Sequence, residues 1–270
     1  MIDSTEILTL PPPRANHRIR YGEGEFHFGD LRLPETLEPI PLVVVIHGGY
    51  WRARYGLEHA GHMCASITAL GYATWNLEYR RLGNVGGGYP GTFLDVAAGM
   101  NHARELARLY PIDLARVVVV GHSAGGQLAL WLAGADRINR NDELPVPDIH
   151  PMHGVVSLAG VLDLRRAWEM GLSNRVTDEF MGGGPKEYPG RYAAASPYEM
   201  LPLNRKQILL HGTNDVNVPF EIGESYFQRA RAAGDDVSFI PLPGIGHFEL
   251  IDPRSAVWPE VENAINRALA

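Results

Sequence analysis

Three side chains that could act as a nucleophile, its base and an orienting acid follow predicted strands far apart in the sequence. Ser123 is the central residue of the G-x-S-x-G segment 121–125, and Asp215 and His247 lie in loops after two later strands. A serine hydroxyl is a weak nucleophile until a base takes its proton, and imidazole suits that task because it titrates near neutral pH. A carboxylate can orient the imidazole and stabilise its charged form. We therefore expect Ser123, His247 and Asp215 to form a catalytic triad.

Each member of this set also has a purely structural interpretation. Ser123 could be a buried serine in a glycine-rich loop, and Asp215 could cap the helix predicted from Phe220. Asp163, which follows the strand ending near residue 159, is an alternative acid. The order Ser, Asp, His, with each residue at the end of a predicted strand, favours catalysis, because open parallel sheets build their sites at those ends.

The segment 47–51 reads H-G-G-Y-W and ends another predicted buried strand. Its glycines would let backbone N–H groups approach a reacting carbonyl. We expect the N–H groups of Gly49, Tyr50 and Ala124 to form an oxyanion hole, in which one donor contributes about 10²–10³ in rate. The alternative is a plain glycine turn with Tyr50 and Trp51 in the core.

Two further histidines adjoin these motifs, in a chain that contains 11 histidines. His47 precedes the glycines of its loop, and we expect it to brace that loop rather than act as a base. His122 is next to Ser123, and we expect its side chain to point elsewhere on the turn. Neither residue is therefore placed in the predicted triad.

The elements that must position these residues follow from the pattern of apolar side chains. The run Val117 to Val120 is β-branched and continuously apolar, which is typical of a strand buried on both faces. The other predicted strands cover 25–33, 42–46, 72–79, 154–159, 207–210 and 237–242, and the predicted helices cover 57–70, 92–109, 126–133, 220–233 and 256–269. This alternation predicts an α/β fold, with a mostly parallel sheet covered by helices on both faces.

The organisation of the chain follows from the same pattern. We expect residues 1–270 to form one domain, because no internal repeat or long linker divides them. Residues 1–20, which include three consecutive prolines, predict an extended N-terminal arm. Residues 161–195 are irregular and predict a small helical cap insertion over the edge of the sheet.

Composition excludes several classes of partner. The net charge is −7 and no basic cluster occurs, so we expect neither nucleic acid nor a membrane surface as a partner. The single cysteine, Cys64, excludes an internal disulfide and a cysteine metal cluster, and we expect it in the core. Without a signal-like segment or a run of about 18 apolar residues, the sequence predicts a cytoplasmic location. It leaves open whether the chain is a monomer or a homodimer.

These motifs together resemble the α/β-hydrolase superfamily, and more narrowly its esterase/lipase branch with an H-G-G loop. Within that branch, H-G-G-Y-W, E-Y-R-R-L-G, G-H-S-A-G-G and A-G-V-L-D-L resemble the serine-type kynurenine formamidases and related bacterial esterases. The pair H-G-T-N-D and G-I-G-H-F is also similar to prolyl-oligopeptidase-type peptidases. The resemblance covers residues 42–250. Tyr50 stands where H-G-G-G lipases have a third glycine, which favours the formamidase-like group.

The resemblance implies a serine hydrolase that cleaves a small carboxylic ester or an aryl formamide through an acyl-enzyme, without a metal or other cofactor. The expected partner is a small-molecule ester or amide. Alternatives are a kynurenine formamidase proper, a prolyl-oligopeptidase-like serine peptidase, a non-catalytic binding module and an acyltransferase. An activity screen with esters, formamides and peptide amides separates these readings.

Five aromatic residues near the predicted site loops are candidates for the substrate pocket. We expect Tyr50, Trp51, Tyr79, Trp168 and Phe248 to line it, with plain core packing as the alternative for each. Such a lining would make an apolar pocket with few polar anchors, which suits small neutral substrates.

Overall fold

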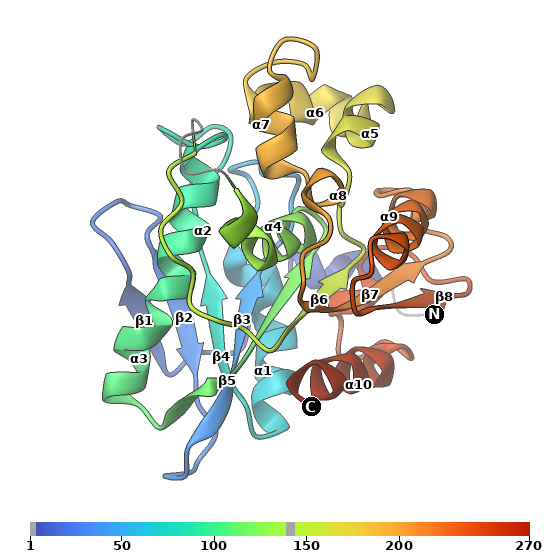
Figure 1. The fold of residues 1–270 in the computed structure, drawn as a ribbon. Coiled ribbons are helices and arrows are strands. Elements are labelled where there is room, and N and C mark those ends of the chain that lie inside the picture. Colours follow the sequence, from blue (N-terminus) through green and yellow to red (C-terminus); the bar gives the residue numbers. More distant parts are fainter. Residues whose placement is uncertain (1–3, 139–143) are drawn as a thin grey trace.

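Within residues 4–138 and 144–270, which the computed structural model describes, eight strands form one mixed sheet (Figure 1). Their order across the sheet is β1-β2-β4-β3-β5-β6-β7-β8. The strands are β1 (His17–Arg20), β2 (Phe28–Arg32), β3 (Ile40–Ile46), β4 (Ala73–Leu77), β5 (Ile112–His122), β6 (Gly154–Leu158), β7 (Lys206–Gly212) and β8 (Val237–Leu242). Strand β2 pairs antiparallel with β1 and β4, and all later pairs are parallel. This confirms the predicted mostly parallel α/β architecture.

Helices cover both faces of the sheet (Figure 1). One face is covered by α1 (Gly61–Ala69) and α10 (Trp258–Leu269). The other face is covered by α2 (Gly91–Asn101), α3 (Ala103–Leu109), α4 (Ala124–Ala133) and α9 (Phe220–Ala232). Short 3-10 helices also occur, namely η2 (Leu57–Ala60), η3 (Ala135–Arg137) and η4 (Glu249–Ile251). The buried apolar side chains accordingly form two clusters, one on each face.

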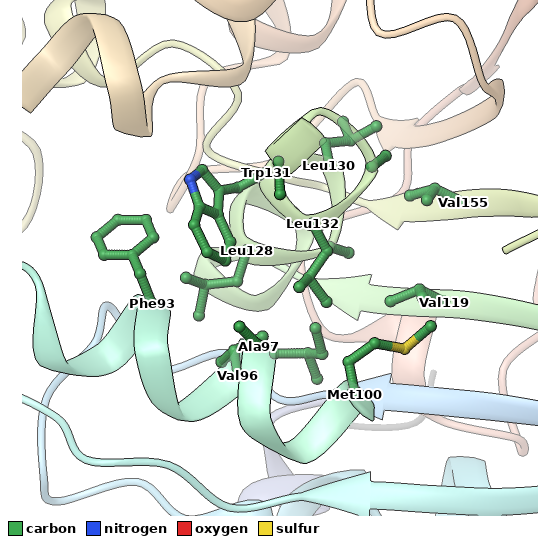
Figure 2. Packing of buried hydrophobic residues seen from close by; sticks show 14 of the residues in the cluster. Phe93, Val96, Ala97, Met100, Val119, Leu128, Leu130, Trp131, Leu132 and Val155 are labelled. Carbon is green, nitrogen blue, oxygen red and sulfur yellow. The ribbon is translucent and has the colours of Figure 1, made fainter. Parts of the chain in front are cut away.

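The central strand β5 shows why both faces are apolar. Val117 and Val119 belong to the cluster beneath α2 and α4, whereas Val118 and Val120 belong to the cluster beneath α1 and α10. Consecutive side chains of a strand point to opposite faces, so a strand covered on both sides requires an unbroken apolar run. Figure 2 shows Val119 in one cluster with the apolar side chains of α2 and α4.

The prediction of an extended arm over residues 1–20 is wrong for the part that the structure describes. Ser4–Leu8 form the 3-10 helix η1, and its Ile7 is buried in the cluster beneath α1 and α10. His17–Arg20 form the edge strand β1. Residues 1–3 lie outside the described residues. The burial of so short an apolar segment depends on contacts with chain far away in sequence, which no local pattern reveals.

The predicted helix over 92–109 is divided into α2 and α3 at His102. The side chain of Asn101 marks the break. Its Oδ1 accepts a hydrogen bond from the backbone N–H of His150 at 2.8 Å, and its Nδ2 donates to the carbonyl oxygen of Asp148 at 2.9 Å. The helix end is therefore tied to a loop that follows much later in the chain.

Short helices lie between β6 and β7, beyond the end of the sheet where the parallel strands finish (Figure 1). They are α5 (Leu164–Glu169), α6 (Leu172–Met181), α7 (Pro189–Ala195) and α8 (Pro197–Met200). They lie in and just beyond the segment 161–195, over which the sequence predicts a helical cap, and the last of them ends at Met200. Near the start of α6, Ser173, Asn174 and Arg175 are in left-handed conformations. Each left-handed conformation costs about 1–2 kcal/mol for a residue with a Cβ atom, so contacts around this segment must stabilise it.

We expect the substitution Leu128→Ala to lower the free energy of unfolding by about 2–5 kcal/mol, because it leaves a cavity in the cluster between α4 and the sheet. Leu128 is fully buried, whereas Leu37 is 95% exposed. The matched control Leu37→Ala should change the same quantity by less than about 0.5 kcal/mol. Urea unfolding followed by circular dichroism measures both variants, and equal effects would contradict this account of the core.

Candidate active site

Ser123 lies in a sharp turn between β5 and α4. Its backbone angles, φ 56° and ψ −121°, are sterically unfavourable for a residue with a side chain. Neighbouring glycines make the turn possible. A Cβ atom on Gly121 would lie 2.1 Å from the carbonyl oxygen of Gly125, and one on Gly125 would lie 2.1 Å from that of Ile46. The turn places Ser123 at the end of the central strand and at the first turn of α4, whose dipole favours negative charge there.

Asp215 and His247 come from the loops after β7 and β8 and meet at the same end of the sheet. Asp215 Oδ2 accepts a hydrogen bond from His247 Nδ1 at 2.6 Å. Asp215 Oδ1 accepts from the backbone N–H groups of Asn217 and Val218 at 2.8 and 2.9 Å. Both carboxylate oxygens are therefore fixed. Since Nδ1 of His247 donates, its Nε2 is the ring nitrogen that can accept a proton.

His211, which the sequence analysis did not single out, also reaches this carboxylate. Its Nε2 donates to the carbonyl oxygen of Val218 at 2.9 Å and lies 3.5 Å from Asp215 Oδ2. Burial raises the pKa of Asp215, but hydrogen bonds from His211 and His247 outweigh burial and hold that pKa below its usual range. Asp215 is therefore ionised at neutral pH. The sequence signal that could have identified His211 is its position at the end of a predicted strand, four residues before Asp215.

His122 contacts His247 directly, so the prediction that it points elsewhere on the turn is wrong. Its Nε2 donates to the carbonyl oxygen of His247 at 3.0 Å, and the two ring centroids are 4.5 Å apart. Burial and the neighbouring His247 ring lower the pKa of His122 well below its usual value. His122 is thus a neutral donor that fixes the backbone of the loop carrying His247.

The loop after β3 has an unusual backbone. Gly49, Tyr50 and Trp51 have φ angles of 112°, 50° and 54°. The left-handed conformation costs about 1–2 kcal/mol for a residue with a Cβ atom, so this loop must be held by its side chains. Trp51 stacks on Phe180 with 4.3 Å between ring centroids and donates to Gln127 Oε1 at 3.1 Å. The conformation of the loop therefore depends on the core beneath it.

The backbone N–H groups of Gly49, Tyr50 and Ala124 have no protein acceptor in the described part of the chain. Backbone N–H groups inside proteins are almost always paired. The unpaired groups here belong to the loop after β3 and to the first residue after Ser123. These N–H groups therefore have hydrogen-bonding capacity that the described part of the chain does not use.

His47 braces this loop from below. Its Nε2 lies 3.1 Å from Glu78 Oε1, its Nδ1 lies 2.7 Å from the carbonyl oxygen of Gly48, and its ring stacks on Tyr79 at 4.4 Å. Tyr79 in turn donates to the carbonyl oxygen of His47 at 2.7 Å. Although burial raises the pKa of Glu78, His47 and Arg81 lower it overall. A buried ionic network thus supports the strained segment.

Ser123 and His247 both line one cavity of about 470 Å³. Its walls come from the loops after β3, β5, β7 and β8, from cap residues 170–174, and from Leu8 of η1. Most of the lining side chains are polar, which differs from the apolar pocket that we expected from aromatic residues. The participation of Leu8 could not be foreseen, because it belongs to the segment expected to be an arm.

A model of the BD-FAE family matches residues 30–229, which is more than half of the chain. The chain belongs to the BD-FAE family. The match includes the loop after β3, the turn at Ser123 and the loop of Asp215, whereas His247 lies beyond it.

The relatives of this BD-FAE protein include proteins that are named as esterases. Esterase LipC of Mycobacterium tuberculosis is 27% identical over 251 residues, which cover 87% of this chain and 60% of LipC. Kynurenine formamidase of Danio rerio is 22% identical over 240 residues, which cover 87% of this chain and 75% of that protein. The chain thus spans less than two thirds of the length of LipC.

Solved structures show the same fold. A truncated carbohydrate esterase from gut microbiota superposes with a TM-score of 0.81 at 20% identity, covering 96% of this chain and 99% of that one. Esterase Est2 of Thermogutta terrifontis, bound to propionate, superposes with a TM-score of 0.73 at 20% identity, covering 94% of this chain and 93% of that one. The BD-FAE protein therefore has the α/β-hydrolase fold.

The predicted aromatic lining of the pocket is correct for only part of the set. Tyr50 and Phe248 line the cavity, whereas Trp51, Tyr79 and Trp168 do not. Trp51 and Tyr79 are 1% and 0% exposed and belong to the core beneath the loop after β3. Trp168 lies within the cap and donates to Asp178. Proximity in sequence to a site loop does not decide whether the backbone turns a side chain toward the cavity or away from it.

The alternative acid Asp163 has a structural role. It caps α5 by accepting a hydrogen bond from the backbone N–H of Arg166 at 3.0 Å, and it does not line the cavity. Cys64 lies in the core as expected, and burial raises the pKa of its thiol to about 12. It is therefore a protonated, inert side chain at neutral pH.

Metal ligation and membrane insertion find no support in the described ranges. No group of three or more His, Cys, Asp or Glu side chains in residues 4–138 and 144–270 is placed to hold a metal ion. The imidazoles of His59, His122 and His247, which line the cavity, do not form such a group. None of the helices in these ranges combines the length and the apolar character needed to cross a bilayer.

We expect Ser123→Gly to be more stable than Ser123→Ala by about 1 kcal/mol. Glycine adopts the positive φ of this turn without steric strain, and the relief of about 1–3 kcal/mol exceeds the entropic cost of adding a glycine to the unfolded chain. Chemical denaturation of both variants measures the difference. If the alanine variant proves equally stable or more stable, the turn is not strained.

A second prediction concerns acid stability. Burial lowers the pKa of His59 to about 3, whereas an unfolded histidine titrates near pH 6.5. Between these values the unfolded state binds more protons, so stability falls as the pH decreases. We expect His59→Gln to reduce the loss of stability between pH 7 and pH 4 by about 3 kcal/mol. The exposed control His153→Gln should retain the wild-type dependence of stability on pH. If His59→Gln also follows the wild-type curve, the low pKa of His59 is refuted.

Proposed function

We propose that this BD-FAE protein is a serine hydrolase that cleaves a small carboxylic ester through an acyl-enzyme. The observation that carries the proposal is the cavity shared by Ser123 and His247, in which Nδ1 of His247 is held by the ionised Asp215. The names of the relatives, an esterase and a formamidase, support the same class of reaction.

In the first step, Ser123 Oγ attacks the carbonyl carbon of the substrate while Nε2 of His247 takes the hydroxyl proton. A carbon–oxygen bond forms, and the carbonyl electron pair moves onto its oxygen. The imidazolium is stabilised by Asp215, whose carboxylate is already oriented by two backbone N–H groups. His122 holds the loop of His247 through its carbonyl oxygen.

The negative oxygen then needs hydrogen-bond donors that are already in place. The N–H groups of Gly49, Tyr50 and Ala124 suit this role because no protein acceptor in the described chain engages them. Donors that are fixed before the reaction stabilise the oxyanion without reorganisation, which is why one of them contributes about 10²–10³ in rate. The left-handed backbone of the loop and its buried support keep these groups in position.

The intermediate collapses when His247 returns the proton to the leaving alcohol or amine, which leaves an acyl group on Ser123. Water then attacks the acyl carbon as His247 takes its proton, and the acid is released with Ser123 restored. Both half-reactions use the same base and the same oxyanion donors. Water is therefore the only second substrate that the two half-reactions require.

An aryl formamide is the second candidate substrate, and the kynurenine formamidase of Danio rerio among the relatives supports it. A formamide follows the same path, with an amine in place of the alcohol as the leaving group. The rates on matched aryl acetates, formanilides and peptide amides rank the candidates, including the peptidase alternative.

We expect Ser123→Ala to lower kcat for p-nitrophenyl acetate by at least about 10³-fold, because it removes the nucleophile that forms the acyl-enzyme. A phosphonate or sulfonyl fluoride should attach to Ser123 in the wild type. The matched control is Ser173→Ala, which alters another serine of the same cavity and should keep most of the activity. Full activity of Ser123→Ala, or an adduct found elsewhere by mass spectrometry, would refute the proposal.

A further inference from the structure

The catalytic cavity contains one permanent charge among its described lining residues. Arg54 lines the cavity, no Asp or Glu among the described residues does, and the imidazoles of His59 and His122 are kept neutral by burial. This is unexpected in a chain whose net charge is −7. The permanent charge carried by the described lining residues is therefore positive, although the protein as a whole is negative.

Arg52 and Arg54 lie on the same loop but differ in their contacts. Arg52 forms an ion pair with Glu179 at 3.2 Å and donates to the carbonyl oxygen of Ser173 at 2.9 Å, so it ties the loop to the cap. Arg54 has no ion pair and no hydrogen bond to another described residue, and its side chain is exposed. Its guanidinium lies over the ring of Tyr55, 4.8 Å from the centroid. The charge of Arg54 is thus available to a ligand.

The backbone that carries Arg54 is fixed, although the charged group is free. Arg52 N donates to the carbonyl oxygen of Gly49 at 3.0 Å, and Tyr55 N donates to that of Arg52 at 3.2 Å. The side chain of Arg81 donates to the carbonyl oxygen of Tyr55. The segment 49–55 therefore folds back on itself. The loop whose N–H groups would hold the oxyanion also carries the cation.

The wall that includes Arg54 is polar beyond the charge itself. Tyr55, Ser173 and Asn174 line the same cavity, and Arg52 holds the cap segment against the loop. A guanidinium presents parallel N–H donors that match the two oxygens of a carboxylate, and hydroxyl and amide groups can add further hydrogen bonds. A small apolar ester would form none of these hydrogen bonds.

We propose that Arg54 determines specificity by binding a carboxylate on the substrate, so that the enzyme prefers esters or amides with an anionic acyl or leaving group. This inference rests on the proposed hydrolase function. The carboxylate could belong to either side of the scissile bond, and two pairs of substrates distinguish them. One pair is mono-p-nitrophenyl adipate and p-nitrophenyl hexanoate, which test the acyl side. The other is 4-acetoxybenzoate and phenyl acetate, which test the leaving group.

The experiment compares the ratio of kcat/KM for the anionic ester to that for the neutral ester in each pair. We expect Arg54→Gln to lower this ratio about tenfold in one pair, mainly through a higher KM, because a charge-assisted hydrogen bond is lost. Arg54→Glu should lower it further. The control Arg104→Gln removes an exposed arginine of α3 that does not line the cavity, and it should leave both ratios unchanged.

Binding measured without turnover separates this inference from the proposed function. Calorimetry with Ser123→Ala should show that mono-p-nitrophenyl adipate or 4-acetoxybenzoate binds about tenfold more weakly once Arg54→Gln is added. If both ratios stay constant in Arg54→Gln, or change equally in Arg104→Gln, the role of Arg54 is refuted while Ser123-dependent hydrolysis stands. If no ester is hydrolysed, the hydrolase proposal fails, and the calorimetric difference alone still upholds or refutes the carboxylate site.

Discussion

The left-handed backbone of Ser123 is the constraint on which the candidate site depends. A residue with a Cβ atom avoids this conformation unless its surroundings impose it. Here the surroundings are the central strand β5, whose valines are packed on both faces, and the close approach of Gly121 and Gly125 to their neighbours. The N–H of Ser123 also donates to the carbonyl oxygen of Leu158 on β6 at 2.8 Å. The rigid core of the sheet thus maintains a turn that short-range preferences would not form.

Buried polar networks extend this rigidity to the loops around Ser123. The loop of Asp215 is fixed by backbone N–H groups and by His211, and the loop of His247 is fixed by Asp215 and His122. The loop after β3 is supported from beneath by His47 and its buried carboxylate partner. Buried polar groups are costly unless they are paired, so each network favours a single arrangement. The proposed mechanism requires such preorganised groups, and the architecture supplies them on separate loops at one end of the sheet.

The other residues that line the cavity differ from these rigid loops, because they come from several parts of the chain. They combine side chains from the sheet loops with the cap and with Leu8 from the first described helix. Residues 173–175, near the start of α6, are themselves strained, and Arg52 links this segment to the loop after β3. The shape of the cavity therefore depends on contacts between three parts of the chain that are remote in sequence. Arg54, which has no ion pair with another described residue, gives the cavity lining a positive charge that the overall composition does not indicate.

Local patterns in the primary structure were sufficient to infer the α/β class, the strand–turn–helix around Ser123, and loops for Asp215 and His247 at strand ends. Those inferences succeed because side-chain periodicity and glycine positions are properties of short segments. The burial of Ile7, the role of His211, the contact of His122 with His247 and the inward packing of Trp51 and Tyr79 were not accessible in this way. Each depends on which remote segment lies opposite. Only long-range packing decides which segments lie opposite one another, because the direction in which a loop side chain points depends on all of the contacts around it.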